Sequence, residues 1–121
     1  MKVLVVDDSS TMRRILINSL NAIGHKDIIQ ASDGVQALEA LGTDPDIGLI
    51  LCDWYMPVMD GISVLKKVKA NPNTKDIPVI MVTTQAEQGS VMEAIQAGAA
   101  NYVVKPFSPQ TIHEKIKAVL G

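Results

Sequence analysis

Four apolar segments of this chain are each followed at once by a side chain that could take part in chemistry. Asp7 and Asp8 follow the first segment, Asp53 follows the second, Thr83 the third and Lys105 the fourth. If these segments are strands of one parallel sheet, the polar side chains meet at its carboxyl edge, where open α/β sheets bind their ligands. The sequence therefore predicts one site that combines three carboxylates, a hydroxyl and an ammonium group.

A cluster of carboxylates requires a cation. Two carboxylates about 4 Å apart repel each other by roughly 4 kcal/mol at an effective dielectric constant of about 20, and a third adds to this cost. Oxygen ligands without histidine or cysteine beside them favour a hard ion, and an incomplete set suits Mg²⁺, which keeps water and accepts phosphate oxygens. With Lys105 and Thr83 nearby, these groups match the needs of phosphoryl transfer, with Asp53 as the nucleophile.

Length and composition narrow the class of protein. The 121 residues, of which 47% are apolar and 3% aromatic, fit one domain with an aliphatic core. We therefore expect residues 1–121 to form a single domain without an appended output domain. A net charge of −2 without a basic run argues against a nucleic-acid surface.

The cellular setting follows from cysteine usage and hydropathy. Cys52 is the only cysteine and stands inside an apolar run, which suits a buried thiol in a reducing compartment. No apolar run is long enough for a signal peptide or a membrane span. We expect a cytoplasmic monomer with no membrane partner.

Strand and helix signals alternate along the chain. Each apolar run is followed by a segment with apolar residues at helical spacing. The expected strands are Val3–Val6, Ile28–Ile29, Ile47–Cys52, Val79–Val82 and Tyr102–Val104. The expected helices begin after Ser9 or Ser10, at Asp33-Gly34, after Gly61, near Val91 and near Ile112, with stops at Gly24, Gly42, Asn71 and Gly98. Lysines 66, 67 and 69 are expected to point outward from the third helix.

This alternation predicts an α/β fold of the (βα)5 type. Right-handed crossovers between successive strands give a doubly wound, five-stranded parallel sheet with helices on both faces. In the flavodoxin-like strand order 2-1-3-4-5, the first and third strands flank the switch point and bring Asp7, Asp8 and Asp53 together. Asp7 and Asp8 could instead cap the first helix, but Ser9 and Ser10 are available for that role.

The ordered motifs resemble those of the response-regulator receiver domain, in particular the stand-alone chemotaxis receivers of the CheY type. The resemblance covers all 121 residues. Five motifs carry it, which are VVDDS at 5–9, DWYMPVMDG at 53–61, VTT at 82–84, AGA at 97–99 and YVVKPF at 102–107.

The resemblance implies a metal site and an acceptor. Asp53 would accept phosphate from a histidine kinase. Asp8, the Asp53 side chain and the main-chain carbonyl of Tyr55 would bind Mg²⁺ directly, and Asp7 would help through water. The protein would be a switch and not an enzyme in the usual sense, although it would catalyse its own phosphorylation and dephosphorylation.

The resemblance also implies a switch and an output surface. Thr83 and Lys105 would contact the phosphoryl oxygens, the Lys105-Pro106 peptide bond would be cis, and Tyr102 would turn inward when Thr83 moves toward the phosphate. Tyr55 and Gln85 would flank the phosphoryl group and tune the rates. The partner, for which the flagellar motor switch is a candidate, would bind the fourth helix, fifth strand and fifth helix, about residues 87–120.

The same motifs can be compared with those that other functions would need. A phosphorelay intermediate would share every active-site residue with a chemotaxis regulator. An adaptor that needs no phosphorylation is disfavoured because the acidic pocket is complete. A haloacid-dehalogenase phosphatase places its nucleophile after the first strand in an Asp-x-Asp arrangement, whereas Asp7 and Asp8 are adjacent. A flavin protein would need a loop rich in Ser, Thr and Gly after the first strand.

Overall fold

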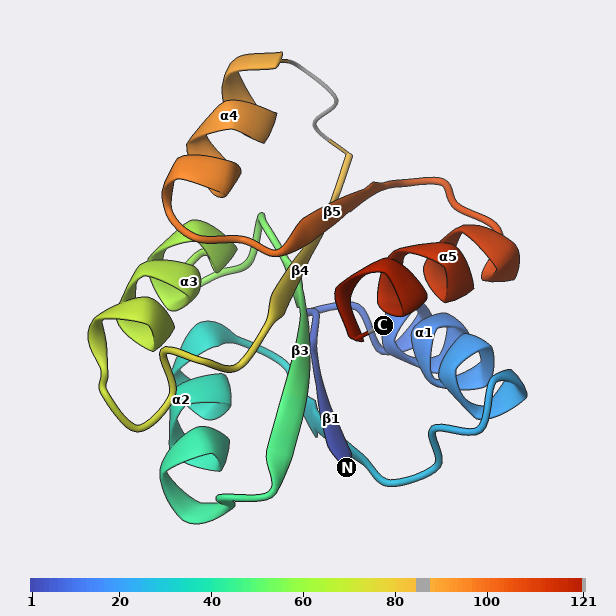
Figure 1. Cartoon of the computed structure of the whole chain (residues 1–121), viewed down its shortest axis with the longest axis horizontal. Helices are drawn as coiled ribbons and strands as arrows, with labels where there is room; N and C mark the ends of the chain where they lie inside the picture. Colours follow the sequence, from blue (N-terminus) through green and yellow to red (C-terminus); the bar gives the residue numbers. More distant parts are fainter. Residues whose placement is uncertain (85–87, 121) are drawn as a thin grey trace.

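The computed structural model describes residues 1–84 and 88–120, in which strands and helices alternate (Figure 1). The strands are β1 (Lys2–Val6), β2 (Ile28–Ala31), β3 (Ile47–Asp53), β4 (Val79–Thr83) and β5 (Asn101–Val104). The helices are α1 (Ser10–Ala22), α2 (Gly34–Thr43), α3 (Gly61–Ala70), α4 (Gln88–Gln96) and α5 (Pro109–Leu120).

The five strands form one parallel sheet in the order β2-β1-β3-β4-β5, as predicted. The register aligns the carboxyl ends of the central strands, because Asp53 is paired with Val82 and Thr83 with Val104. The polar residues that end or follow these strands therefore share one edge of the sheet.

Two helical layers enclose the sheet, with α1 and α5 on one face and α2, α3 and α4 on the other (Figure 1). Successive residues of β1 point to opposite faces, so Val3 and Val5 pack with α1 and α5, while Leu4 and Val6 pack against the other layer. All four side chains are fully buried. A strand covered on both faces explains the unbroken apolar run in the sequence.

Capping side chains and glycines lie at the helix ends largely as the sequence predicts. The side chains of Ser9, Asp33 and Asp60 accept hydrogen bonds from the first turns of α1, α2 and α3, which satisfies amides that lack a partner within the helix. Gly24 and Gly98 have φ values of 94° and 105° just after α1 and α4. A glycine tolerates this left-handed conformation without the steric cost of a Cβ atom.

Two expectations for the helices were wrong in detail. The second helix was expected to stop at Gly42, but α2 continues to Thr43, whose hydroxyl donates to the carbonyls of Glu39 and Ala40 and so stabilises one more residue. Lys69 does not point outward as Lys66 and Lys67 do. Its ammonium group donates to the carbonyls of the α3–β4 loop and is half-buried there.

Candidate functional site

The three aspartates predicted to converge do lie together at the carboxyl edge of the sheet. Asp7 and Asp8 follow β1, and Asp53 ends β3 beside it. One carboxylate oxygen from each of the three residues lies within 4.8 Å of the other two. Asp7 and Asp53 are buried and Asp8 is exposed, so the cluster opens to solvent on the Asp8 side.

Lys105 places its ammonium group between the two buried carboxylates. Its Nζ atom lies 3.1 Å from Asp7 Oδ2 and 3.2 Å from Asp53 Oδ1. Lys105 follows β5, and its backbone N–H donates to the carbonyl of Thr83 at 2.7 Å. The Lys105-Pro106 peptide bond is cis. Charged residues from three distant parts of the chain thus meet in one pocket.

Burial and neighbouring charges shift the pKa values of Asp53 and Lys105. The pKa of Asp53 is raised, first by burial and then by the neighbouring Asp7 carboxylate, while Lys105 opposes both effects. Burial alone would lower the pKa of Lys105, but its hydrogen bonds and charge interactions with Asp7 and Asp53 outweigh this, and the pKa is raised. One ammonium group therefore only partly offsets the repulsion between the carboxylates.

The β1–α1 connection holds Asp7 in place. Asp7 Oδ1 accepts a hydrogen bond from Ser9 N at 2.9 Å, and Ser9 Oγ caps α1 by accepting from Met12 N at 3.2 Å. The capping role therefore belongs to Ser9, and the carboxylate of Asp7 is turned toward Lys105. The competing interpretation of Asp7 as a helix cap is wrong.

Arg13 is a part of this arrangement that the sequence did not reveal. Arg13 Nη1 donates to the backbone carbonyl of Asp7 at 2.6 Å, and Nε donates to Gln30 Oε1 at 3.0 Å. The guanidinium thus links the first turn of α1 to the end of β1 and to β2. An arginine at helical spacing gave no signal for such a contact, because its partner is a main-chain atom.

The β3–α3 loop packs closely around the backbone of Asp53. Trp54 is 6% exposed and belongs to the core, whereas Tyr55 is 54% exposed beside it, with the ring centroids 6.3 Å apart. Gly61 donates its N–H to the Trp54 carbonyl at 2.7 Å. A Cβ atom at Gly61 would overlap the carbonyl of Asp53, so only glycine allows the start of α3 to approach the strand end this closely.

The remaining predicted residues fall at different places. Thr83 ends β4 and is buried, at the same edge of the sheet as Asp53. Tyr102 in β5 is half-buried, and the Lys115 ammonium lies 5.2 Å from the centre of its ring. Gln85, and Glu87 at the start of the expected partner surface, lie outside the described residues.

Comparison with known proteins assigns the chain to a family. Residues 3–117 match the family model described as the response regulator receiver domain. The chain belongs to the response-regulator receiver family. The prediction from its motifs is therefore confirmed, and the protein is a two-component response regulator, a class of signalling switch and not a classical enzyme.

The receiver domain is similar to chemotaxis proteins over its whole length. It is 49% identical over 121 residues to the chemotaxis protein CheY1 of Helicobacter pylori strain J99, which covers 100% of this chain and 98% of that protein. It is also 49% identical to the chemotaxis protein CheY homolog of Campylobacter jejuni strain 81-176, covering 93% of that protein. These relatives support a place among chemotaxis regulators.

Solved structures agree with the fold of this receiver domain. The chemotaxis response regulator CheY4 of Vibrio cholerae superposes with a TM-score of 0.90 at 34% identity, covering 98% of each chain. A putative response regulator from Chloroflexus aurantiacus gives a TM-score of 0.91 at 31% identity, covering 98% of this chain and 96% of the other. No helix in the described part of the receiver domain is long and apolar enough to cross a membrane.

The donor set of the receiver pocket fits Mg²⁺. Receiver domains bind Mg²⁺ at an acidic pocket, and the three carboxylates here supply hard oxygen ligands but too few to complete six-fold coordination without water. The neighbouring Cys52 does not compete as a ligand, because burial raises the pKa of its thiol and keeps it protonated. The pKa of Asp53 is raised first by burial and then by the neighbouring Asp7 carboxylate, and a divalent cation would oppose both effects.

Proposed function

We propose that the protein is a Mg²⁺-dependent phosphorylation switch of chemotaxis signalling, with Asp53 as the phosphoryl acceptor. The main support is the position of the Lys105 ammonium, which contacts both Asp7 and Asp53 within 3.2 Å. Asp53 ends β3 beside the exposed side of the cluster, so a phosphoryl donor can approach it from solvent. In this proposal Asp8, Asp53 and the Tyr55 carbonyl hold the metal, and Asp7 acts through water.

Phosphoryl transfer to Asp53 needs no external acid at this residue. A carboxylate oxygen of Asp53 attacks phosphorus as the P–N bond of a kinase phosphohistidine breaks, and the imidazole leaves and takes up a proton. Bound Mg²⁺ would supply positive charge to the oxygens of the transferred group. Lys105 lies where it can turn from the carboxylates to a phosphoryl oxygen, and the Thr83 hydroxyl can donate to another. Attack by water on phosphorus later restores the Asp53 carboxylate and releases phosphate.

The output is a change of conformation read by a partner. Moving a two-state equilibrium from 1:99 to 99:1 takes about 5.5 kcal/mol of differential stabilisation, which a dianion beside a metal, a lysine and a hydroxyl can provide. Thr83 and Tyr102 carry the change in this proposal, since Tyr102 lies in β5 next to β4, which ends at Thr83. The partner surface would comprise α4, β5 and α5, and its reader would be a flagellar motor switch protein.

We also propose a cellular location for the protein and two residues that set the lifetime of its acyl phosphate. The single receiver domain would act in the cytoplasm as a monomer, receiving phosphate from a histidine kinase. Tyr55, whose side chain is 54% exposed two residues after Asp53, would shield the acyl phosphate from water and prolong its lifetime. Gln85 would be the second rate-tuning position. An unchanged lifetime of the acyl phosphate in Tyr55→Asn would contradict the shielding role.

Trp54 fluorescence tests the acceptor directly. Trp54 is the only tryptophan and follows Asp53 in sequence, so the signal has one source. Acetyl phosphate or beryllofluoride should change the emission only when Mg²⁺ is present, and Asp53→Asn should abolish the response. An Asp53→Asn protein that responds like the parent would exclude Asp53 as the acceptor. Transfer from the protein to a histidine phosphotransfer domain would favour the phosphorelay alternative.

A further inference from the structure

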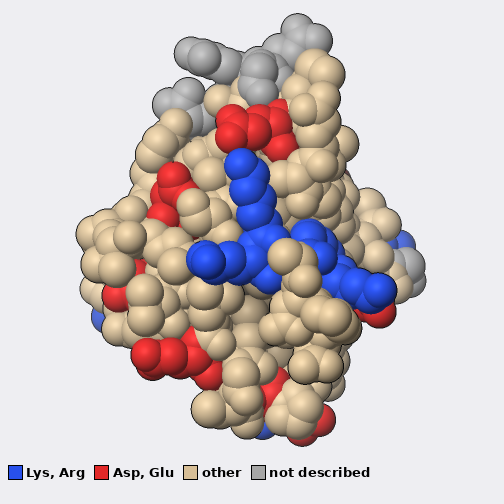
Figure 2. Space-filling view, turned by 90° about the vertical axis from the view of Figure 1, so that its left-hand side faces the viewer, with Lys and Arg blue, Asp and Glu red and all other residues tan. Residues whose placement is uncertain are grey.

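The face formed by α2 and α3 carries a group of lysines, with acidic side chains at its upper end (Figure 2). Figure 2 shows basic side chains gathered in a band across the middle of this face. Lys66 and Lys67 on α3 and Lys75 in the α3–β4 loop are exposed, and none of them forms an ion pair with any residue that the structure describes. Lys69 is different, because its ammonium donates to the carbonyls of Lys75 and Ile77 at 2.9 and 2.8 Å.

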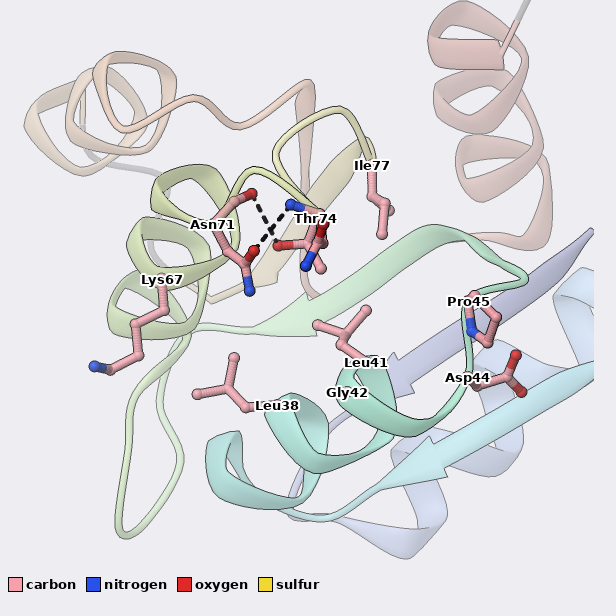
Figure 3. Close-up of a pocket in the computed structure, with 10 residues that line it drawn as sticks. Leu38, Leu41, Gly42, Asp44, Pro45, Lys67, Asn71, Thr74 and Ile77 are labelled. Atoms are coloured by element: carbon pink, nitrogen blue, oxygen red, sulfur yellow. Dashed lines mark hydrogen bonds between the residues drawn. The ribbon is translucent and has the colours of Figure 1, made fainter.

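A groove of about 680 Å³ lies beside these lysines, between the carboxyl-terminal halves of α2 and α3. Leu38, Leu41 and Ile77 line it and are only partly buried, so the groove has an aliphatic floor (Figure 3). Lys67 stands at its α3 rim and Asp44 at the opposite end. Asp44 is already paired with Lys2 at 2.7 Å, so Lys67 is the charged side chain of the lining that forms no ion pair with a described residue.

The polar wall of the groove is held by its own hydrogen bonds. Thr74 donates its N–H to the Asn71 carbonyl at 3.0 Å and its hydroxyl to the Val68 carbonyl at 2.8 Å. Asn73 N donates to Asn71 Oδ1 at 2.9 Å. Because this wall is ordered without a ligand, a binding partner has little conformational entropy to remove.

We propose that this groove docks an acidic segment of a partner protein that carries aliphatic side chains. The aliphatic groups would cover Leu38, Leu41 and Ile77, and the carboxylates would lie against Lys67 and its neighbouring lysines. No aromatic residue lines the groove, so a nucleic acid would find no surface on which its bases could stack. Charge complementarity therefore selects an acidic polypeptide.

This docking goes beyond the switch described above and is independent of it. The groove lies at the ends of β3 and β4 where Asp44, Pro45 and Ile77 precede the strands, whereas the acidic pocket lies at their opposite ends. It is also formed without residues of α4, β5 or α5. A segment bound there would stay bound in both phosphorylation states and would tether the receiver to its partner.

Isotope-edited NMR with a synthetic peptide tests the proposal. The probe is a short, blocked peptide of Asp and Glu with leucine at every third or fourth position, compared with the same peptide in which every acid is replaced by its amide. The acidic peptide should shift the amide signals of Leu38, Leu41, Lys67 and Thr74 in the full chain, and the amide peptide should not. Inorganic phosphate alone should leave Leu38 and Leu41 unshifted.

Matched charge reversals complete the test. Lys67→Glu should weaken binding of the acidic peptide by about three- to tenfold, whereas Lys117→Glu, an equally exposed change on α5, should alter it less than twofold. Equal losses in the two variants, shifts on another face, or full reproduction of the shifts by phosphate would each overturn the proposal.

Activation of the same sample separates this proposal from the phosphorylation switch. Affinity for the peptide should change less than twofold when beryllofluoride and Mg²⁺ are added, and a requirement for either reagent would overturn docking that is independent of phosphorylation. The Trp54 response to beryllofluoride, read in the same titration, shows whether the acidic pocket has been activated.

Discussion

Lys105 Nζ lies 3.2 Å from Asp53 Oδ1, within ion-pair distance of the proposed acceptor. The same ammonium contacts Asp7 Oδ2 at 3.1 Å. One cation shared by two buried anions leaves a net negative charge in the pocket. Bound Mg²⁺ would offset this negative charge, which would couple metal binding to stability.

Removal of the Lys105 charge tests this coupling. Lys105→Met keeps the aliphatic stem but leaves Asp7 and Asp53 without their cation, so it should destabilise the metal-free protein by about 1–3 kcal/mol. Saturating Mg²⁺ should reduce this loss of stability relative to the parent. Urea denaturation with and without Mg²⁺ measures both effects, and Lys117→Met, on the exposed side of α5, should change stability by less than about 0.5 kcal/mol. Equal stability of Lys105→Met and the parent without metal would contradict the account.

The raised pKa of Asp53 predicts a pH dependence with a definite sign. A folded-state pKa above the unfolded value means that stability is greatest below the unfolded pKa and is lost as pH rises through the folded one. Asp53→Asn lacks this loss. Without metal it should therefore be more stable than the parent at about pH 7, and the difference should shrink toward about pH 4. Denaturation curves across this pH range measure the difference in stability. If the parent became more stable relative to Asp53→Asn as pH rises, the prediction would be wrong.

The guanidinium of Arg13 should act on the pocket through the backbone. Arg13→Ala removes the 2.6 Å bond to the Asp7 carbonyl and should weaken Mg²⁺ binding several-fold while costing about 1 kcal/mol of stability. Arg13→Lys retains the charge but cannot bridge Asp7 and Gln30, so it should recover only part of the affinity. Calorimetric Mg²⁺ titration measures this. Arg14→Ala, at the exposed neighbouring position, is the control, and an equal effect there would reduce the role of Arg13 to general charge.

Glycine positions offer a paired test of backbone approach. Gly61→Ala would place a methyl group on the Asp53 carbonyl and should destabilise the protein by more than about 2 kcal/mol while disturbing the Trp54 emission. Gly42 lies inside α2 with open space around it, so Gly42→Ala should stabilise by about 0.5–1 kcal/mol. Thermal unfolding of both variants measures the contrast. A tolerated Gly61→Ala would mean that the β3–α3 loop can move away from the acceptor.

Much of this site could be predicted from the sequence because its reactive side chains lie directly at the ends of strands. The parallel sheet forces Asp7, Asp53 and Lys105 to one edge once the alternation of strands and helices is recognised. Contacts made through main-chain atoms were not accessible, since the bond from Arg13 to the Asp7 carbonyl depends on how α1 turns on the sheet. Lys69 was misread for a similar reason, because its partners are loop carbonyls.

The β3–α3 loop carries backbone strain at Val58. Val58 has a φ of 72° and is 81% exposed, and the bond from Met59 N to the Pro57 carbonyl, 2.8 Å, closes a tight three-residue turn around it. A β-branched residue is costly in this conformation and gains little from packing here. Val58→Gly should therefore stabilise the protein by about 0.5–1 kcal/mol, the relief of strain exceeding the added chain entropy of the unfolded state.

Chemical denaturation of Val58→Gly, with Val58→Ala as the matched variant, measures this balance. Alanine keeps a Cβ atom and the steric cost of a positive φ, so Val58→Ala should gain less than Val58→Gly. If alanine stabilised as much as glycine, the benefit would come from loss of the exposed isopropyl group and not from relief at the backbone. If neither variant were more stable than the parent, the positive φ of Val58 would carry no measurable strain and the prediction would be wrong.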